Sequence, residues 1–367
     1  FKQKTAYEIM PSLVGSEMCI RDRSSDEGTY LFYKMVGPNG NVLIDETNLN
    51  PCANPTTYHV RRPSIVIDSN NNVHVVFHGF SLYTQFDVSE YGDRIDLDAS
   101  EVIYIKINPY LDDMDGSPAD FFTITVIPET IISTDDGVKS RAPNIAIDLF
   151  DRLHIAWWDG GGGSGGGAGT EIHYLVMDTD GNDLVSETIL STDIYVDVDW
   201  GEPEIATDPN GNAHIVYCTD TWDTEREIYY TMVDGDDGST LIDDTRITSD
   251  DGSASVRASL AVDSASMVHV VWHDKRFYDA GTGEHELFYS KLDPSLDDQD
   301  GDAADPAVIS VISEQLITTN DGYRSYLKNL AVDSLDRVHI TWVDMYGFTD
   351  PEDDDWGKGE IYYQMLD

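Results

Sequence analysis

PEIATDPNGNAHIVY, which spans residues Pro203 to Tyr217, is one of five segments of the 367-residue chain that align without gaps. The other four begin at Pro63, Pro143, Ala258 and Lys328. In every copy an Asp precedes a His by six residues, and an aromatic residue follows the His three residues later. Self-similarity of this kind predicts an architecture assembled from one repeated structural unit.

After a loop of variable length, each unit continues with a second signature. Its copies are EVIY from Glu101, EIHY from Glu171, EIYY from Glu227, ELFY from Glu286 and EIYY from Glu360, and YLFY from Tyr30 opens the array. The runs are rich in β-branched and aromatic residues and are bounded by Gly, Asn, Asp and Pro, which is typical of strands. Each unit therefore predicts four antiparallel strands, here called A to D, which form one blade of a β-propeller.

We predict an all-β fold, a β-propeller of about six blades whose first and last blades are partial. The propeller would occupy residues 29–367, with a partial blade at 29–50, blades at about 60–133, 141–191, 201–248 and 256–318, and a partial blade at 326–367. Residues 1–28 lack this pattern and are predicted to be non-native or disordered. Within them, residues 7–23 resemble a translated sequencing-adapter read-through from an environmental assembly, and we exclude them from the fold.

The charge balance is strongly acidic, with 69 acidic and 22 basic side chains and a net charge of -47. This charge argues against nucleic acid as a partner, because binding a phosphate backbone requires a basic surface. A dense carboxylate surface favours solubility in a saline medium, so we expect an extracellular or cell-surface protein. No signal-peptide pattern and no apolar run of 18 or more residues occurs. Three cysteines, Cys19, Cys52 and Cys218, predict no disulfide framework.

The repeated Asp and His are the most conspicuous polar residues, and we interpret them as structural. A group that stands at the same offset in every blade serves the blade rather than a single site. These residues are Asp68, His74, Asp148, His154, Asp208, His214, Asp263, His269, Asp333 and His339. The aromatic residue that ends strand B is expected to fill space between blades.

The blade pattern resembles the sialidase-like propellers with BNR or Asp-box repeats, and also the TolB-like propellers, over about residues 29–367. In that group the Asp-box, S-x-D-x-G-x-T-W, lies between strands C and D. Here DGDDGSTL from Asp234 keeps the Asp, Gly and Thr but has Asp234 in place of Ser and Leu241 in place of Trp. A sialidase site also implies three arginines, a Tyr with a Glu base and an Asp acid. Arg61 and Arg141, each two residues before a Pro, are similar to an R-x-P start of strand A.

In a propeller, the B-to-C loops and the D-to-A loops emerge on one face. These loops are long and mutually dissimilar here, and variable loops on a rigid scaffold are where function collects. We predict that this face binds an anionic or polyhydroxylated ligand such as an acidic glycan; simple pairing of its arginines with carboxylates is the alternative. The candidate residues are Arg61, Arg62, Arg141, Arg257, Arg276, Arg324, His78, Trp158, Asp159, His273, Asp274 and Asp344.

Two predicted C-to-D turns, from Leu111 and from Leu296, share the pattern LDDxDGxxAD. Aspartates at alternate positions around a Gly turn could direct several hard oxygens at one calcium ion, although the full twelve-residue EF-hand spacing is absent. The candidate ligands are Asp113, Asp115, Asp120, Asp298, Asp300, Asp302 and Asp305. The turns resemble the calcium loops of dockerin and thrombospondin repeats, and solvated Asp-rich turns are the alternative.

These observations predict a secreted or cell-surface β-propeller that binds a glycan or another surface protein, with structural calcium. The alternative is a glycan-active enzyme, either a sialidase-like glycoside hydrolase or a propeller polysaccharide lyase that uses His and Tyr. An enzyme requires one blade to break the repeat with an acid/base pair. HGF at His78, where other blades place an Asp after the aromatic residue, is a candidate break.

Overall fold

The computed structural model describes residues 31–49, 60–79, 100–160, 170–191, 202–219, 226–277, 285–321, 324–346 and 358–366. Residues 1–28, the adapter-like stretch within them, Cys19 and Cys52 lie outside these ranges. Cys218 is buried, with a free thiol.

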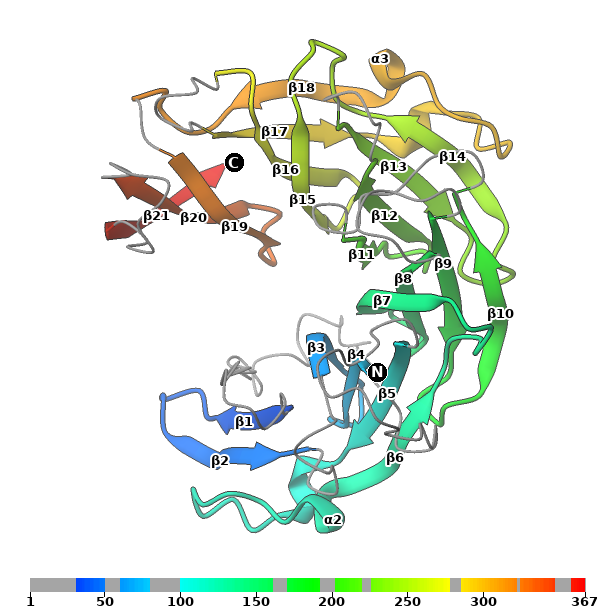
Figure 1. Cartoon of the computed structure of the whole chain (residues 1–367), viewed down its shortest axis with the longest axis vertical. Coiled ribbons are helices and arrows are strands. Elements are labelled where there is room, and N and C mark those ends of the chain that lie inside the picture. Colours follow the sequence, from blue (N-terminus) through cyan, green and yellow to red (C-terminus); the bar gives the residue numbers. More distant parts are fainter. Residues whose placement is uncertain are drawn as a thin grey trace, which may run out of the picture. The chain divides into compact units, whose positions relative to one another are not determined.

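The described chain is almost entirely strand, arranged in consecutive antiparallel sheets (Figure 1). The first sheet has two strands, the last has three, and each of the other four has four strands. The fold class is thus a β-propeller of four-stranded antiparallel blades. The strands are β1 (Phe32–Val36) and β2 (Val42–Asn48); β3 (Val60–Ile67), β4 (Val73–Gly79), β5 (Glu101–Ile107) and β6 (Thr125–Ile131); β7 (Lys139–Ile147), β8 (Leu153–Gly160), β9 (Thr170–Met177) and β10 (Asp183–Ile189); β11 (Glu204–Thr207), β12 (Ala213–Cys218), β13 (Ile228–Val233) and β14 (Thr240–Arg246); β15 (Ser255–Val262), β16 (Val268–Asp274), β17 (Glu286–Leu292) and β18 (Ser310–Leu316); and β19 (Arg324–Val332), β20 (Val338–Tyr346) and β21 (Lys358–Leu366).

Contacts divide the chain into two compact units, residues 1–162 with 177–183, and residues 163–176 with 184–367. Each unit has its own core. In the first unit Phe77 of β4 and Ile105 of β5 belong to one apolar cluster. In the second unit Trp272 of β16 and Phe288 of β17 belong to another. Strands β4, β8, β12 and β16 are buried at every residue, which explains why strand B reads as a nearly continuous apolar run.

The repeated Asp and His form a hydrogen-bonded chain that joins three strands of one blade. Asp68 Oδ1 accepts the backbone N–H groups of Asn70 and Asn72, and Asp68 Oδ2 lies 3.3 Å from His74 Nε2. His74 Nδ1 lies 2.7 Å from the Tyr104 hydroxyl on β5. The six-residue spacing therefore lets one carboxylate close the A-to-B turn and orient a buried histidine. In the second unit, Asp263, His269 and Tyr289 repeat these contacts.

These contacts affect the charge of the aspartate. Burial alone would raise the pKa of Asp68, but the hydrogen bonds from Asn72 and His74 outweigh burial and hold it below its ordinary value. The pKa of Asp148 is lowered in the same way, by hydrogen bonds from His154 and Arg152. The pKa of Asp263 is lowered by hydrogen bonds from Met267 and His269. The ionised carboxylate is thus the form that the turn requires.

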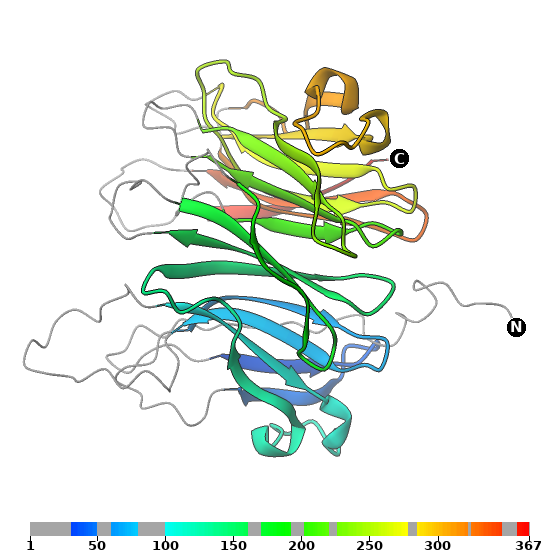
Figure 2. The same ribbon diagram turned by 90° about the vertical axis from the view of Figure 1, so that its right-hand side faces the viewer.

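The two Asp-rich turns bind to the outer strand of the preceding sheet in their own unit. Gly116 N–H donates to Leu43 O at 3.0 Å, and Asp45 N–H donates to Ser117 O at 2.9 Å. In the second turn, the Gly301 N–H donates in the same way to the backbone oxygen of Leu241. Gly116 has φ +87°, and a Cβ there would lie 3.2 Å from Val42 O, so the glycine is required. Each turn ends in a short helix, α2 (Phe121–Ile124) or α3 (Pro306–Ile309), drawn in cyan and orange in Figure 2.

Candidate functional site

A second repeated polar group lies where strand C begins. In the first unit, Glu101 accepts a hydrogen bond from Ser133 Oγ at 2.5 Å, and Ser140 Oγ donates to Asp159 at 2.7 Å and lies 3.3 Å from Glu101. In the second unit, Glu286 accepts from Thr318, and Ser325 Oγ donates to Asp344 at 2.7 Å and lies 3.5 Å from Glu286. These hydrogen bonds join the start of strand C to the D-to-A loop and to strand A of the next blade.

Asp159, Asp274 and Asp344, which the sequence analysis placed in the ligand rim, all stand in this repeated group. Asp274 accepts from Ser255 and from Trp272 Nε1, both at 3.2 Å. It also binds Arg276 at 2.7 Å, and Arg276 contacts Glu314 at 3.0 Å and lies over the Phe288 ring. Trp158 is buried in β8. These contacts hold the three aspartates and Arg276 within the blades.

The repeated glutamates carry a pH dependence. Burial raises the pKa of Glu101, Glu227 and Glu286 from about 4.5 to about 7. Because the folded pKa is raised, the stabilisation is complete below pH 4.5 and is lost as the pH rises through about 7. We expect each carboxyl to contribute on the order of 1 kcal/mol after solvent screening. Unfolding free energy should therefore fall between pH 5 and 8.

Denaturant unfolding at a series of pH values tests this expectation. The triple variant E101Q/E227Q/E286Q should flatten the decline between pH 5 and 8. A matched triple variant at exposed glutamates, E46Q/E202Q/E360Q, controls for the change in net charge. An equal slope in both triple variants would show that general charge repulsion, not these buried carboxyls, sets the dependence.

A different kind of cluster lies in the second unit, where β15, β16, β17 and β19 end or begin. It consists of Arg257, His273, His285, Arg324 and Tyr326, and is called the His273 centre below. The ring centroids of His273 and Tyr326 are 5.2 Å apart, and those of His273 and His285 are 6.3 Å apart. The guanidinium carbons of Arg324 and Arg257 lie 4.4 Å and 5.1 Å from the centroid of the Tyr326 ring. Two imidazoles, a phenol and two guanidinium groups thus lie together in one cluster.

Local strand geometry positions these side chains. His273 pairs with Val256 of β15 and with Leu287 of β17 in the β-sheet register. A bulge between Val256 and Ser259 interrupts the β15–β16 ladder and leaves Arg257 with φ +53°. The same bulge recurs in the β3–β4, β7–β8 and β19–β20 ladders, with φ +51° at Arg62 and +50° at Ala142, so it is a feature of the blade. In this blade the bulge carries an arginine.

The electrostatics of the centre favour neutral histidine. Burial, together with the charges of Arg324, Lys275 and Arg257, lowers the pKa of His285 to about 3. His273 and His285 are 1% and 4% exposed, whereas Arg257, Arg324 and Tyr326 are half-buried. Positive charge and a phenol thus lie on the more accessible side of two buried imidazoles.

None of these five residue types recurs in every blade. Where His273 stands, the other aligned segments continue with His78, Trp158, Cys218 and Val343. His285, directly before strand C, aligns with Ser100, Thr170, Arg226 and Gly359, and Tyr326 aligns with Arg141 and Val256. Of the predicted rim residues the structure brings together Arg257, His273 and Arg324 here. The sequence analysis missed His285 and Tyr326, although their departure from the aligned columns is a signal that could have identified them.

The first unit contains three of the predicted arginines, Arg61, Arg62 and Arg141. Arg61 lies opposite His78 in the β3–β4 register, and the Ala142 N–H on β7 donates to His78 Nδ1 at 3.2 Å. Arg141 Nε donates to Ser100 Oγ at 3.2 Å. Burial and the charges of Arg62, Arg141 and Arg61 lower the pKa of His78 to about 3. We call Arg61, Arg62, His78 and Arg141 the Arg61 cluster.

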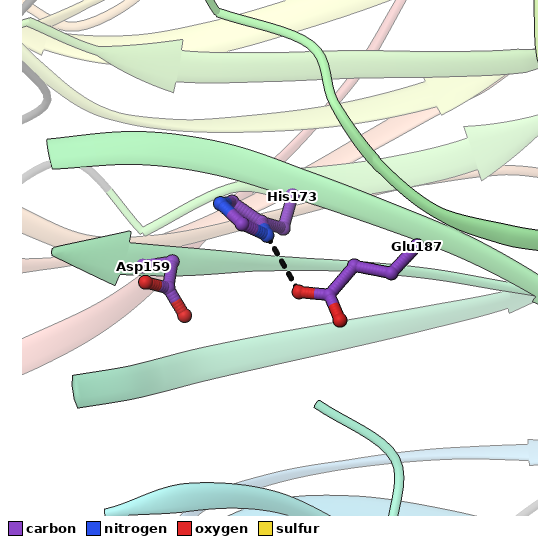
Figure 3. A group of neighbouring side chains, drawn as sticks. All are labelled: Asp159, His173 and Glu187. Atoms are coloured by element: carbon purple, nitrogen blue, oxygen red, sulfur yellow. Dashed lines mark hydrogen bonds and ion pairs between the residues drawn. The ribbon is translucent and has the colours of Figure 1, made fainter. Parts of the chain in front are cut away.

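A further histidine, which the sequence analysis did not single out, lies on β9. His173 Nδ1 is 2.6 Å from Glu187 Oε1 on the neighbouring strand β10, as Figure 3 shows, and His173 Nε2 is 3.5 Å from Glu171. Both His173 and Glu187 are half-buried. The pair is a cross-strand contact between β9 and β10.

Five of the seven predicted calcium ligands accept hydrogen bonds within a turn or at a helix cap. Asp115 accepts the Ser117 N–H at 2.9 Å, and Asp120 and Asp305 cap α2 and α3. Asp113 and Asp300 accept the N–H groups of the residues two positions later, at 3.4 Å and 3.2 Å. The carboxylates of Asp298 and Asp302, like the other five, are not gathered in groups of three whose oxygens could share one ion in the described part of the chain.

Calcium at these turns stays a prediction with a direct test. Adding calcium to EDTA-treated protein should raise the melting temperature, because an ion that binds only the folded state stabilises it. The variant D115N/D300N should abolish the increase while keeping the turn hydrogen bonds to an Asn oxygen. If calcium leaves the melting temperature of the wild type unmoved, the aspartates act only as turn and cap residues.

No helix within the described ranges is long and apolar enough to cross a membrane.

No family model and no curated protein matches this sequence. Among solved structures, a protein of unknown function from Dyadobacter fermentans DSM 18053 matches with a TM-score of 0.53 and 12% identity, covering 84% of this chain and 79% of that chain. Polysaccharide lyase Uly1 matches with a TM-score of 0.46 and 8% identity over 97% and 90%. The Hadza microbial sialidase Hz136 matches with a TM-score of 0.44 and 10% identity over 86% and 60%. At these identities the likeness is one of fold.

Proposed function

We propose that this chain acts on an acidic polysaccharide and cleaves it by β-elimination at the His273 centre. The observation that carries the proposal is the packing of Tyr326 against His273 with Arg257 and Arg324 on its ring, at positions that the repeat does not explain. This is the glycan-active alternative of the sequence analysis, in its lyase form.

Elimination at a uronic acid requires three contributions. A cation neutralises the carboxylate and so acidifies the proton at C5; a base removes that proton; and an acid protonates the oxygen that leaves C4. The C5–H electron pair then forms the C4–C5 double bond as the C4–O bond breaks. Positioned proton transfer of this kind contributes about 10²–10⁴-fold in rate.

The His273 centre offers a group for each contribution. Arg257 and Arg324 can hold a carboxylate between two fixed positive charges, and guanidinium groups are suited to planar oxyanions. We assign removal of the C5 proton to His273, whose ring packs against Tyr326. Tyr326, half-buried and beside both arginines, is the group we assign to protonate the oxygen that leaves C4. Burial and the charges of Arg324, Lys275 and Arg257 lower the pKa of His285. A bound carboxylate would offset the charges of Arg324 and Arg257, so this pKa should rise when substrate is bound.

Hydrolysis is less well supported by the same residues. A glycoside hydrolase of the common kind needs two carboxylates about 5–10 Å apart, one of them an acid. The carboxylates nearest in sequence to the centre are Asp274 and Glu286, and both are held in the repeated serine and threonine group. Because the same group recurs at Glu101 and Asp159, its place in the blade is structural.

The test is incubation of the protein with uronic-acid polysaccharides and with neutral polysaccharides as controls. Elimination produces a double bond conjugated to the carboxylate, which absorbs in the ultraviolet, and only the uronic-acid polymers should give this signal. Release of reducing ends without that absorbance would favour a sialidase-like or other hydrolase. Saturable binding with no new ends would favour the binding module predicted first.

An extracellular or cell-surface location belongs to the same proposal. A net charge of -47 suits a protein that remains soluble at high ionic strength, where screening limits repulsion between carboxylates. Polymeric acidic substrates are also met outside the cell. Detection of the protein in the culture medium or on intact cells tests the location.

A further inference from the structure

The Arg61 cluster occupies the same strand positions in its blade as the His273 centre does in another. His78 aligns with His273 on strand B, and Arg62 aligns with Arg257 on strand A. The backbone agrees with the alignment, since the strand A ladder is interrupted between Arg61 and Ser64 and Arg62 has φ +51°. A bulge thus places an arginine in the left-handed region beside a histidine in both blades.

The Arg61 cluster lacks the counterparts of Tyr326 and His285. The position of Tyr326 is taken by Arg141, and the position of His285 by Ser100. Arg141 Nε donates to Ser100 Oγ, so the two replacements contact each other. The Arg61 cluster therefore carries one more positive charge and lacks the phenol and the second imidazole.

His78 is held in a single neutral form. Its Nδ1 accepts the Ala142 N–H, so in the neutral ring the proton is on Nε2. Burial and the three arginines keep the pKa of His78 far below neutrality, at about 3. A ring in this state can donate a hydrogen bond from Nε2 to an anion but is a poor base at neutral pH.

The carboxylate that ends strand B in three other blades is also absent. Asp159, Asp274 and Asp344 stand at that position, whereas β4 ends at Gly79. In the second unit Asp274 binds Arg276 at 2.7 Å. At Gly79 this blade carries no carboxylate at that position. Arg61 and Arg62 are exposed, and Arg141 is half-buried.

We propose that Arg61, Arg62, Arg141 and His78 form a second, non-catalytic site that binds the oxyanion of an acidic sugar, a carboxylate or a sulfate ester. In a chain with 69 acidic and 22 basic side chains, three neighbouring arginines form a local region of opposite charge. Guanidinium groups bind both oxyanions by charge-assisted hydrogen bonds. Such a site would hold an anionic polymer independently of cleavage and raise its local concentration.

The test is a titration followed by the ring C–H resonances of His78 in the full-length protein. The probes are D-glucuronate and D-glucose 6-sulfate, with D-glucose as the neutral control. We expect one or both anionic sugars to give a saturable shift at His78 and glucose to give none. Which of the two sugars binds distinguishes carboxylate recognition from sulfate recognition.

Variants separate this site from the His273 centre. The variant R61Q/R62Q should weaken the affinity reported by His78 at least about tenfold. R141Q provides a second, single-site variant, and R246Q, at an exposed arginine elsewhere, is the matched control. R257Q/R324Q should leave the His78 titration unchanged even if it abolishes turnover. No saturable shift with either anion, or an equal shift in R61Q/R62Q, would overturn the proposal.

Discussion

Replacing Tyr326 with Phe should lower turnover of an acidic polysaccharide by about 10²–10⁴-fold, because the substitution removes the hydroxyl assigned to proton transfer. The ring remains, so its packing against His273 and beneath Arg257 and Arg324 should persist. Binding of the polymer should therefore change little. The measurement is the initial rate of ultraviolet absorbance, with affinity measured in parallel by calorimetry.

The matched control for this variant is Tyr110→Phe, a tyrosine that is 48% exposed in the first unit and should tolerate the change without loss of rate. If Y326F turns over the substrate at the wild-type rate, the Tyr326 hydroxyl takes no part in the reaction. An equal loss of binding and rate would assign Tyr326 to substrate recognition instead. The pH dependence of the remaining activity should also change in Y326F, whereas a simple loss of packing would leave it unchanged.

Replacing Trp272 with Ala should lower the unfolding free energy by about 3–5 kcal/mol. Trp272 is fully buried, its ring stacks on Phe288 with centroids 6.1 Å apart, and its Nε1–H donates to Asp274. The substitution leaves a large cavity and removes the donor from Asp274. Denaturant unfolding measures the change.

A leucine at an exposed turn gives the control for Trp272. Leu335→Ala, at 69% exposure, should change the unfolding free energy by less than about 0.5 kcal/mol. An unfolding curve of W272A that matches the wild type would show that the aromatic residue at the end of strand B does not fill the core.

The blade was predictable from the sequence because its determinants are local and recur. The Asp-to-His spacing defines the A-to-B turn, and the alternating runs define the strands. A four-stranded antiparallel sheet follows from their order, as β15 to β18 show. The Asp-rich turns were visible too, but their attachment to the preceding outer strand, through Gly116 and Gly301, depends on contacts between blades that no single repeat contains.

The candidate site was predictable only in part. His273, Arg257 and Arg324 were chosen because basic groups are scarce and lie beside variable loops. Tyr326 and His285 were missed because they stand at either end of a long stretch of chain, and only the pairing of β15 to β17 and the packing of β19 bring them to His273. Conversely, Asp274 and Asp344 were chosen for their place at the rim, yet each binds a serine in the repeated group.

The most direct test of the account is the chemical nature of the new chain ends that the wild-type protein produces from an acidic polysaccharide. Mass spectrometry of the products distinguishes the two reactions, because elimination gives an unsaturated end that is lighter by one water than the end left by hydrolysis. Elimination at the His273 centre should give unsaturated ends that disappear in Y326F and persist in R61Q/R62Q. Saturated ends from the wild type, or an intact polymer, would contradict it.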